Sequence, residues 1–150
     1  MTTFFAFLHH AAAFALVAAL AVEFVLLKGE LSAATMRRIV RADMVVGLSA
    51  GVVLLVGLAR VFHFEKGSGY YLHSWPFIGK LSMFILVAVL SIYPTITFLK
   101  WAKALRQGAV PPLDAGRLRM LRMLIHAELG GIVLILLFAA MMARGVGFFG

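Results

Sequence analysis

Cysteine is absent from the 150 residues of this chain, so disulfides, thiolate metal sites and cysteine nucleophiles are excluded. Charge is also scarce, because charged residues make up 13% of the chain against about 25% in a typical soluble domain. Acidic side chains are the rarest, with 6 Asp and Glu against 14 Lys and Arg. The sequence also lacks a phosphate-binding glycine loop, a dinucleotide fingerprint and a GxSxG elbow, the signatures of several large soluble enzyme classes.

Apolar residues dominate instead, at 63% of the chain. A membrane-spanning helix needs about 20 mostly apolar residues in succession. Four stretches meet this condition: Phe4–Leu27, Asp43–Phe62, Phe77–Leu99 and Leu121–Met142. The sequence therefore predicts an all-α integral membrane protein with one domain over residues 1–150, arranged as a four-transmembrane-helix up-down bundle. We expect the first stretch to be a retained helix rather than a signal peptide, because no basic segment precedes it.

The basic residues are distributed unevenly over the connections between these stretches. Most lie at the first and third connections: Lys28, Arg37, Arg38, Arg41, Lys100, Lys103, Arg106, Arg117, Arg119 and Arg122. The opposite side has only Arg60, Lys66, Lys80 and Arg144. Because cytoplasmic loops are enriched in Lys and Arg, both termini are predicted on the non-cytoplasmic side. The net charge of +8 indicates contact with the lipid bilayer rather than with nucleic acid.

Two features predict how the helices pack. Gly130 and Gly131 would let the fourth helix approach a neighbour closely. Pro94 removes a backbone hydrogen bond and predicts a kink in the third helix, where Ser91, Thr95 and Thr97 are near enough to satisfy freed backbone groups.

One group of polar residues falls in the outer half of the predicted spans: His9, His10, Arg60 and Lys80. Neutral histidine nitrogen is the commonest protein metal ligand, and haem iron often takes one. A neighbouring Lys or Arg suits the haem propionates. The alternative is that the two histidines are interfacial residues near a helix end, where amphipathic rings are favoured.

A second group falls in the inner half: Glu23, Asp43, His126 and Glu128. A charge at this depth costs about 2.5–3.5 kcal/mol on insertion scales, so such residues need compensation. One interpretation is ion pairing of Glu23 or Glu128 with Arg41, Arg122 or another helix. The other is a proton relay.

Several motifs carry a resemblance to a known family. They are Phe7-Leu8-His9-His10, Arg60-Val61-Phe62, Tyr71-Leu72-His73-Ser74-Trp75, Gly79-Lys80-Leu81, Ser91-Ile92-Tyr93-Pro94-Thr95 and Met142-Ala143-Arg144-Gly145. With these, the whole chain resembles a bacterial family of four-span membrane proteins that carry a domain of unknown function. The resemblance implies a multi-pass protein of the bacterial inner membrane and names no activity.

A more distant resemblance is to HemJ-type protoporphyrinogen oxidases, which are small polytopic haem b proteins. It rests on Leu8-His9 and on Trp75 followed by Lys80-Leu81, and the chain departs from that family at Tyr93-Pro94, where a Tyr-His pair is expected. The resemblance implies His9 as the axial metal ligand and Lys80 as a haem-site or catalytic lysine.

The first hypothesis is therefore a haem b-binding membrane oxidoreductase. His9 would bind the iron, with His10 as the substitute, and Lys80 and Arg60 would hold propionates or an anionic substrate. Glu23 and Glu128 would handle protons.

The sequence is also compatible with two further hypotheses. In one, the chain is an accessory or assembly subunit of a larger membrane complex, and its polar residues only pair helices. In the other, it is a small proton-coupled transporter that acts as a homodimer, with Glu23 and Glu128 in the pathway.

Overall fold

The computed structural model describes residues 2–64 and 73–147 and is all-helical. Its elements are α1 (Thr2–Lys28), α2 (Ala33–Ala59), the π-helix η1 (Arg60–Phe64), α4 (Trp75–Arg106) and α5 (Ala115–Ala143). Within these residues, four helices are long and apolar enough to cross a membrane, which confirms the predicted fold class. Lys66, Tyr71 and Leu72, used above for orientation and resemblance, lie outside the described residues.

The helices extend beyond the predicted apolar spans. The placement of Arg37, Arg38 and Arg41 in the first connection was wrong, because α2 begins at Ala33 and contains all three arginines. Ser32 caps this helix, accepting a hydrogen bond from the Thr35 backbone N–H at 3.2 Å. Asp114 caps α5 in the same way, accepting from the Arg117 N–H at 3.0 Å. Arginine ends an apolar run without ending a helix, because it is a good helix former.

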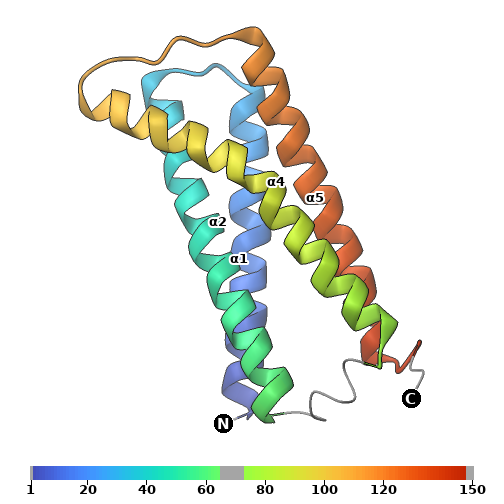
Figure 1. Ribbon diagram of the computed structural model, residues 1–150. Coiled ribbons are helices and arrows are strands. Elements are labelled where there is room, and N and C mark those ends of the chain that lie inside the picture. The colour runs from blue at the N-terminus through green and yellow to red at the C-terminus, as the bar shows by residue number, and fades with distance from the viewer. Residues whose placement is uncertain (1, 65–72, 148–150) are drawn as a thin grey trace.

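The helices form two hairpins, α1–α2 and α4–α5, that together make a V (Figure 1). The hairpins meet at the end that carries the α1–α2 and α4–α5 connections, called here the closed end. They diverge toward the end where the chain begins and finishes, called here the open end (Figure 1). The up-down order of helices is thus as predicted, whereas the side of the membrane on which the termini lie stays a prediction.

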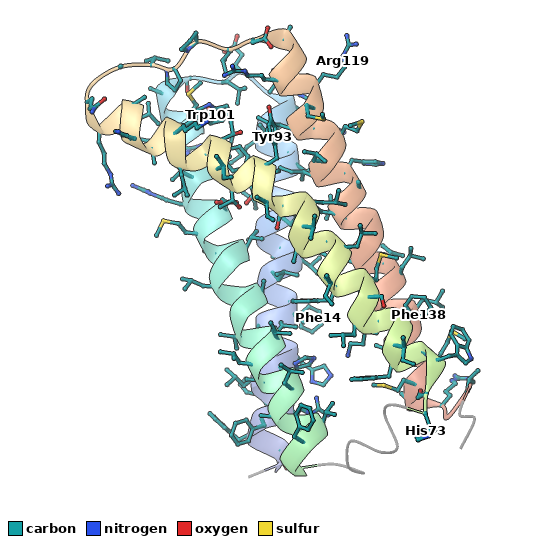
Figure 2. The ribbon with its side chains drawn as sticks, viewed as in Figure 1. Phe14, His73, Tyr93, Trp101, Arg119 and Phe138 are labelled. Atoms are coloured by element: carbon teal, nitrogen blue, oxygen red, sulfur yellow. The ribbon has the colours of Figure 1, made fainter. Side chains whose placement is uncertain are left out.

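The core lies toward the closed end. Its fully buried members are Leu20, Leu27, Met36, Ile39, Phe98, Leu121 and Ile125. The second half of α4 crosses α2 there, and it brings Phe98 and Trp101 into the core with their ring centroids 5.3 Å apart (Figures 1 and 2). Most other large apolar side chains face outward, which suits a protein surrounded by lipid.

Figure 1 shows α4 bending in its middle part, where the helix contains Pro94. Two of the three nearby hydroxyls bond to backbone carbonyl oxygens: Ser91 donates to Ala88 at 2.9 Å and Thr97 donates to Tyr93 at 2.9 Å. Thr95 does not, because its hydroxyl donates to another helix.

Glycine permits close contact at two points between α4 and α5. A Cβ on Gly131 would collide with the Val87 side chain, whereas one on Gly130 would meet nothing within 4 Å. A Cβ on Gly79 would lie 3.1 Å from the Phe138 ring, which packs beside α4 (Figure 2). Of the two adjacent glycines in α5, only Gly131 lies at the contact with α4.

Candidate functional site

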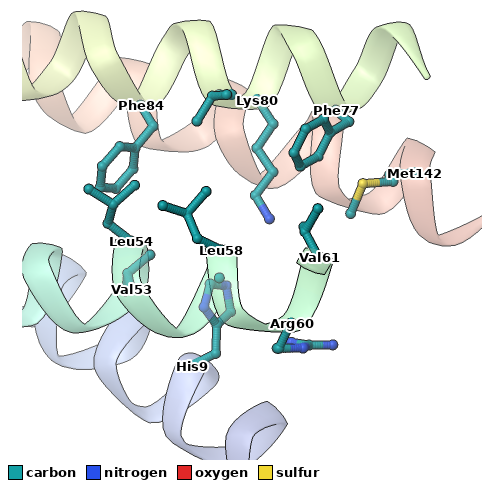
Figure 3. A pocket seen from close by; sticks show the side chains of 12 residues that line it. His9, Val53, Leu54, Leu58, Arg60, Val61, Phe77, Lys80, Phe84 and Met142 are labelled. Carbon is teal, nitrogen blue, oxygen red and sulfur yellow. The ribbon is translucent and has the colours of Figure 1, made fainter. Parts of the chain in front are cut away.

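A cavity of about 110 Å³ lies between the two hairpins toward the open end (Figure 3). All four long helices and η1 contribute to it, so it exists only when the hairpins are assembled. The lining consists of apolar side chains and three basic ones: His9, Val53, Leu54, Gly57, Leu58, Arg60, Val61, Phe77, Lys80, Leu81, Phe84 and Met142. We call this space the open-end cavity.

His9 reaches the cavity from α1 by packing against α2. Gly57 makes this possible, because a Cβ there would lie 3.2 Å from the His9 Cε1 atom. The imidazole is hydrogen-bonded to the Val53 backbone. Its Nδ1 atom is buried and has no hydrogen-bond partner. A neutral imidazole in this state keeps one nitrogen lone pair available as a ligand or acceptor.

Arg60 and Lys80 make the cavity electropositive. Arg60 opens η1, and Lys80 extends from α4 toward Leu58 and His9 (Figure 3). Both cations are close enough to act electrostatically on the imidazole. The charged residues in the lining are all basic, so the cavity favours a ligand with negative charge and an apolar body.

His10 is not part of this cavity. Its side chain is exposed, and its Nδ1 lies 2.6 Å from the Ala6 carbonyl oxygen on its own helix. Of the two histidines that the sequence offers as alternative ligands, only His9 lines the cavity, although the two rings are in edge-to-face contact with centroids 5.9 Å apart.

The predicted site residues Glu23 and Glu128 meet elsewhere, with Asp43. The three side chains come from α1, α5 and α2, and each is at most 7% exposed. Thr95 of α4 donates its hydroxyl to Asp43 Oδ1 at 2.8 Å. All four long helices thus supply one polar side chain to this group, which we call the carboxyl cluster. One oxygen of Glu23 and one of Glu128 are buried with no hydrogen-bond partner.

The expectation that these carboxyls form ion pairs is not met in the described part of the chain. Arg122 instead donates from Nε to the Leu27 carbonyl oxygen at 2.7 Å. Arg41 and His126 are exposed, and the His126 ring stacks near Phe24 with centroids 5.6 Å apart. Only the carboxyls, and not the predicted histidine, are brought together.

A second cavity of about 220 Å³ adjoins the carboxyl cluster. Glu128, Thr95 and Ser91 give it a polar side, and the remaining lining is apolar or glycine. Leu54 and Phe84 line both this cavity and the open-end cavity, so the two spaces are neighbours along the inter-hairpin interface. Among the described residues, no group of His, Asp and Glu is arranged to hold a metal ion by itself.

Sequence reasoning did not select Met142, Gly57 or Thr95 as site residues. Met142 stands in a motif that carried the family resemblance, but an apolar residue near a helix end gave no chemical signal. Thr95 was expected to satisfy the backbone near Pro94. Its contact with Asp43 depends on how α4 crosses α2, which no local pattern encodes.

One of the comparisons with known proteins agrees with a membrane protein. A family model described as "Predicted membrane protein (DUF2214)" matches residues 1–147. The chain belongs to the DUF2214 family. Membership accounts for almost the whole chain and supports an integral membrane protein of unknown function. No curated protein and no solved structure matches the chain, so no comparison links this member of the family to HemJ-type oxidases.

Proposed function

We propose that this protein binds haem b in the open-end cavity, where His9 would hold the iron. The observation that carries the proposal is a buried imidazole nitrogen without a partner, beside two basic side chains and an apolar wall. Arg60 and Lys80 would hold the propionates, and Phe77, Leu81 and Phe84 would contact the porphyrin. When bound, haem would supply one-electron redox chemistry. His10 has no part in the proposed site, because it does not line the cavity.

The side chains that line the cavity suit haem, but the present volume of the cavity is too small for it. The cavity of about 110 Å³ is smaller than the ~300–1,000 Å³ of usual ligand sites. Binding at His9 therefore requires the hairpins to separate further at the end where they already diverge (Figure 1). Met142 lines the same cavity, and its thioether would be available to hold the iron as well.

The test is an absorption spectrum of protein purified from haem-replete cells. We expect a Soret band that disappears in His9→Ala and persists in His10→Ala and His126→Ala, the matched controls outside the cavity. A colourless wild-type protein, or an unchanged band in His9→Ala, would contradict the proposal.

The carboxyl cluster favours a second candidate, proton-coupled transport. Burying several carboxyl groups without cations is costly, and ionisable residues inside membrane proteins often mark proton pathways. The supporting observation is the pair of unpartnered oxygens on Glu23 and Glu128, of which Glu128 lines the second cavity. A protein of four spans gives a thin pathway, so this candidate includes a homodimer.

This candidate is tested in liposomes that contain a pH-sensitive dye. An imposed pH gradient should collapse faster with the wild-type protein than in protein-free liposomes. Glu128→Gln should remove the difference, whereas Glu30→Gln, at an exposed loop position, should not. Equal rates with and without the wild-type protein would eliminate the candidate.

A further inference from the structure

A third hollow lies at the closed end, between α2 and α4, away from both sites described above. It has a volume of about 460 Å³ and is lined by Arg37, Val40, Arg41, Met44, Ala102, Leu105 and Arg106. All three charged residues in the lining are arginines, and each is exposed. We call this hollow the arginine groove.

The arginines are held in place by helices but are not engaged by other groups. Arg37 and Arg41 are four residues apart on α2 and share one face, while Arg106 stands in the last turn of α4. In the described part of the chain, no hydrogen bond or ion pair occupies their guanidinium groups. Three unneutralised cations around one hollow attract an anion, and arginine forms paired hydrogen bonds with phosphate oxygens in particular.

The apolar part of the groove indicates what carries the anion. Val40, Met44 and Leu105 line it beside the arginines, and Met44 is 59% exposed on the outward surface of α2. Leu48, one turn further along the same helix, is 71% exposed. The groove thus joins a cationic head region to an apolar strip on a membrane-spanning helix.

We propose that the arginine groove binds the phosphodiester headgroup of an anionic phospholipid, with an acyl chain lying along α2. Basic pockets between membrane helices recognise anionic lipid headgroups in this manner. The ligand is a lipid rather than free phosphate, because the apolar lining continues into the lipid-facing surface. This inference is independent of haem binding and of proton transport.

The experiment uses the purified full chain and native mass spectrometry after exchange into mixed micelles of phosphatidylglycerol and phosphatidylcholine. We expect the wild-type protein to retain phosphatidylglycerol at least tenfold more than phosphatidylcholine. The triple variant Arg37→Gln, Arg41→Gln, Arg106→Gln should lose this preference.

The matched control is the triple variant Arg38→Gln, Lys103→Gln, Arg119→Gln. It removes the same charge from exposed closed-end positions that do not line the groove. The control should keep the wild-type preference, and circular dichroism should show unchanged helix content in both variants. Equal retention of the two lipids by the wild-type protein, or equal loss of preference in both triple variants, would overturn the proposal.

Discussion

The Thr95–Asp43 hydrogen bond is the one direct link between side chains within the carboxyl cluster that the described residues contain. Thr95→Val keeps the shape of the side chain but removes the donor, leaving a buried Asp43 oxygen without its partner. Such a loss costs about 1–2 kcal/mol. We expect this decrease in the free energy of unfolding, measured by denaturant titration in micelles.

Thr97→Val is the control for that experiment. The Thr97 hydroxyl bonds only to the Tyr93 carbonyl oxygen on its own helix, and its removal should cost less than about 0.5 kcal/mol. Equal decreases in the free energy of unfolding of the two variants would show that the hydrogen bond between helices stabilises the fold no more than the one within α4.

Gly57 determines where the His9 ring lies, since even a Cβ there would press on Cε1. Gly57→Val should therefore displace the imidazole and lower haem content at least tenfold, without loss of helix content by circular dichroism. Gly51→Val, on the same helix but with nothing near its Cβ position, should keep the wild-type spectrum. A normal Soret band in Gly57→Val would show that haem binding does not depend on this position of the His9 ring.

Depth along a helix is readable from sequence, whereas direction around it is not. Residue number alone placed His9, Arg60 and Lys80 at one level, because each residue advances a helix by about 1.5 Å. The choice between His9 and His10 needed the partner helix, because neighbours differ by about 100° around the axis. The contact with Gly57 makes that choice.

At the scale of helices, the contact between α4 and α5 depends on Gly131. Its Cβ would strike Val87, whose branched side chain has little rotamer freedom. Gly131→Ala should cost about 1–3 kcal/mol by overpacking, read as a lower melting temperature in micelles. Gly130→Ala, one position away and facing open space, should leave stability unchanged or slightly raised. A larger loss of stability in Gly130→Ala than in Gly131→Ala would mean that α4 and α5 pack through another face.

Apolar runs located the four helices but not their ends. Ser32 and Asp114, the residues that start α2 and α5, have the side chains favoured at helix N-termini, and both precede polar segments rather than apolar ones. Counting apolar residues therefore set the start of α2 too late. The capping residues, not hydropathy, mark the boundaries.

At the scale of the whole molecule, the orientation in the membrane is open to a direct test. The absence of cysteine makes single-cysteine labelling possible without background. An impermeant thiol reagent applied to intact cells, with any outer barrier removed, should label Val146→Cys at the open end. Gln107→Cys at the closed end should react only after the membrane is permeabilised, because basic residues concentrate on the cytoplasmic side. The opposite pattern would invert the predicted topology.

The relation between the hairpins was the least predictable feature. Spacing could not indicate that Glu23, Asp43 and Glu128 face one another rather than an arginine, because this depends on helix rotation and on the bend of α4. The three cavities likewise form between helices, so they have no signature in any single segment.

The carboxyl cluster has a consequence for biogenesis. Glu23 and Asp43 leave the ribosome on the first hairpin, whereas Thr95 and Glu128 are synthesised much later. Until α4 arrives, the carboxyl group of Asp43 has no hydroxyl to bond, and a newly inserted first hairpin exposes acidic groups to acyl chains or to the translocon. The first hairpin should therefore be retained at the insertion machinery and released into the bilayer only as the second hairpin joins it.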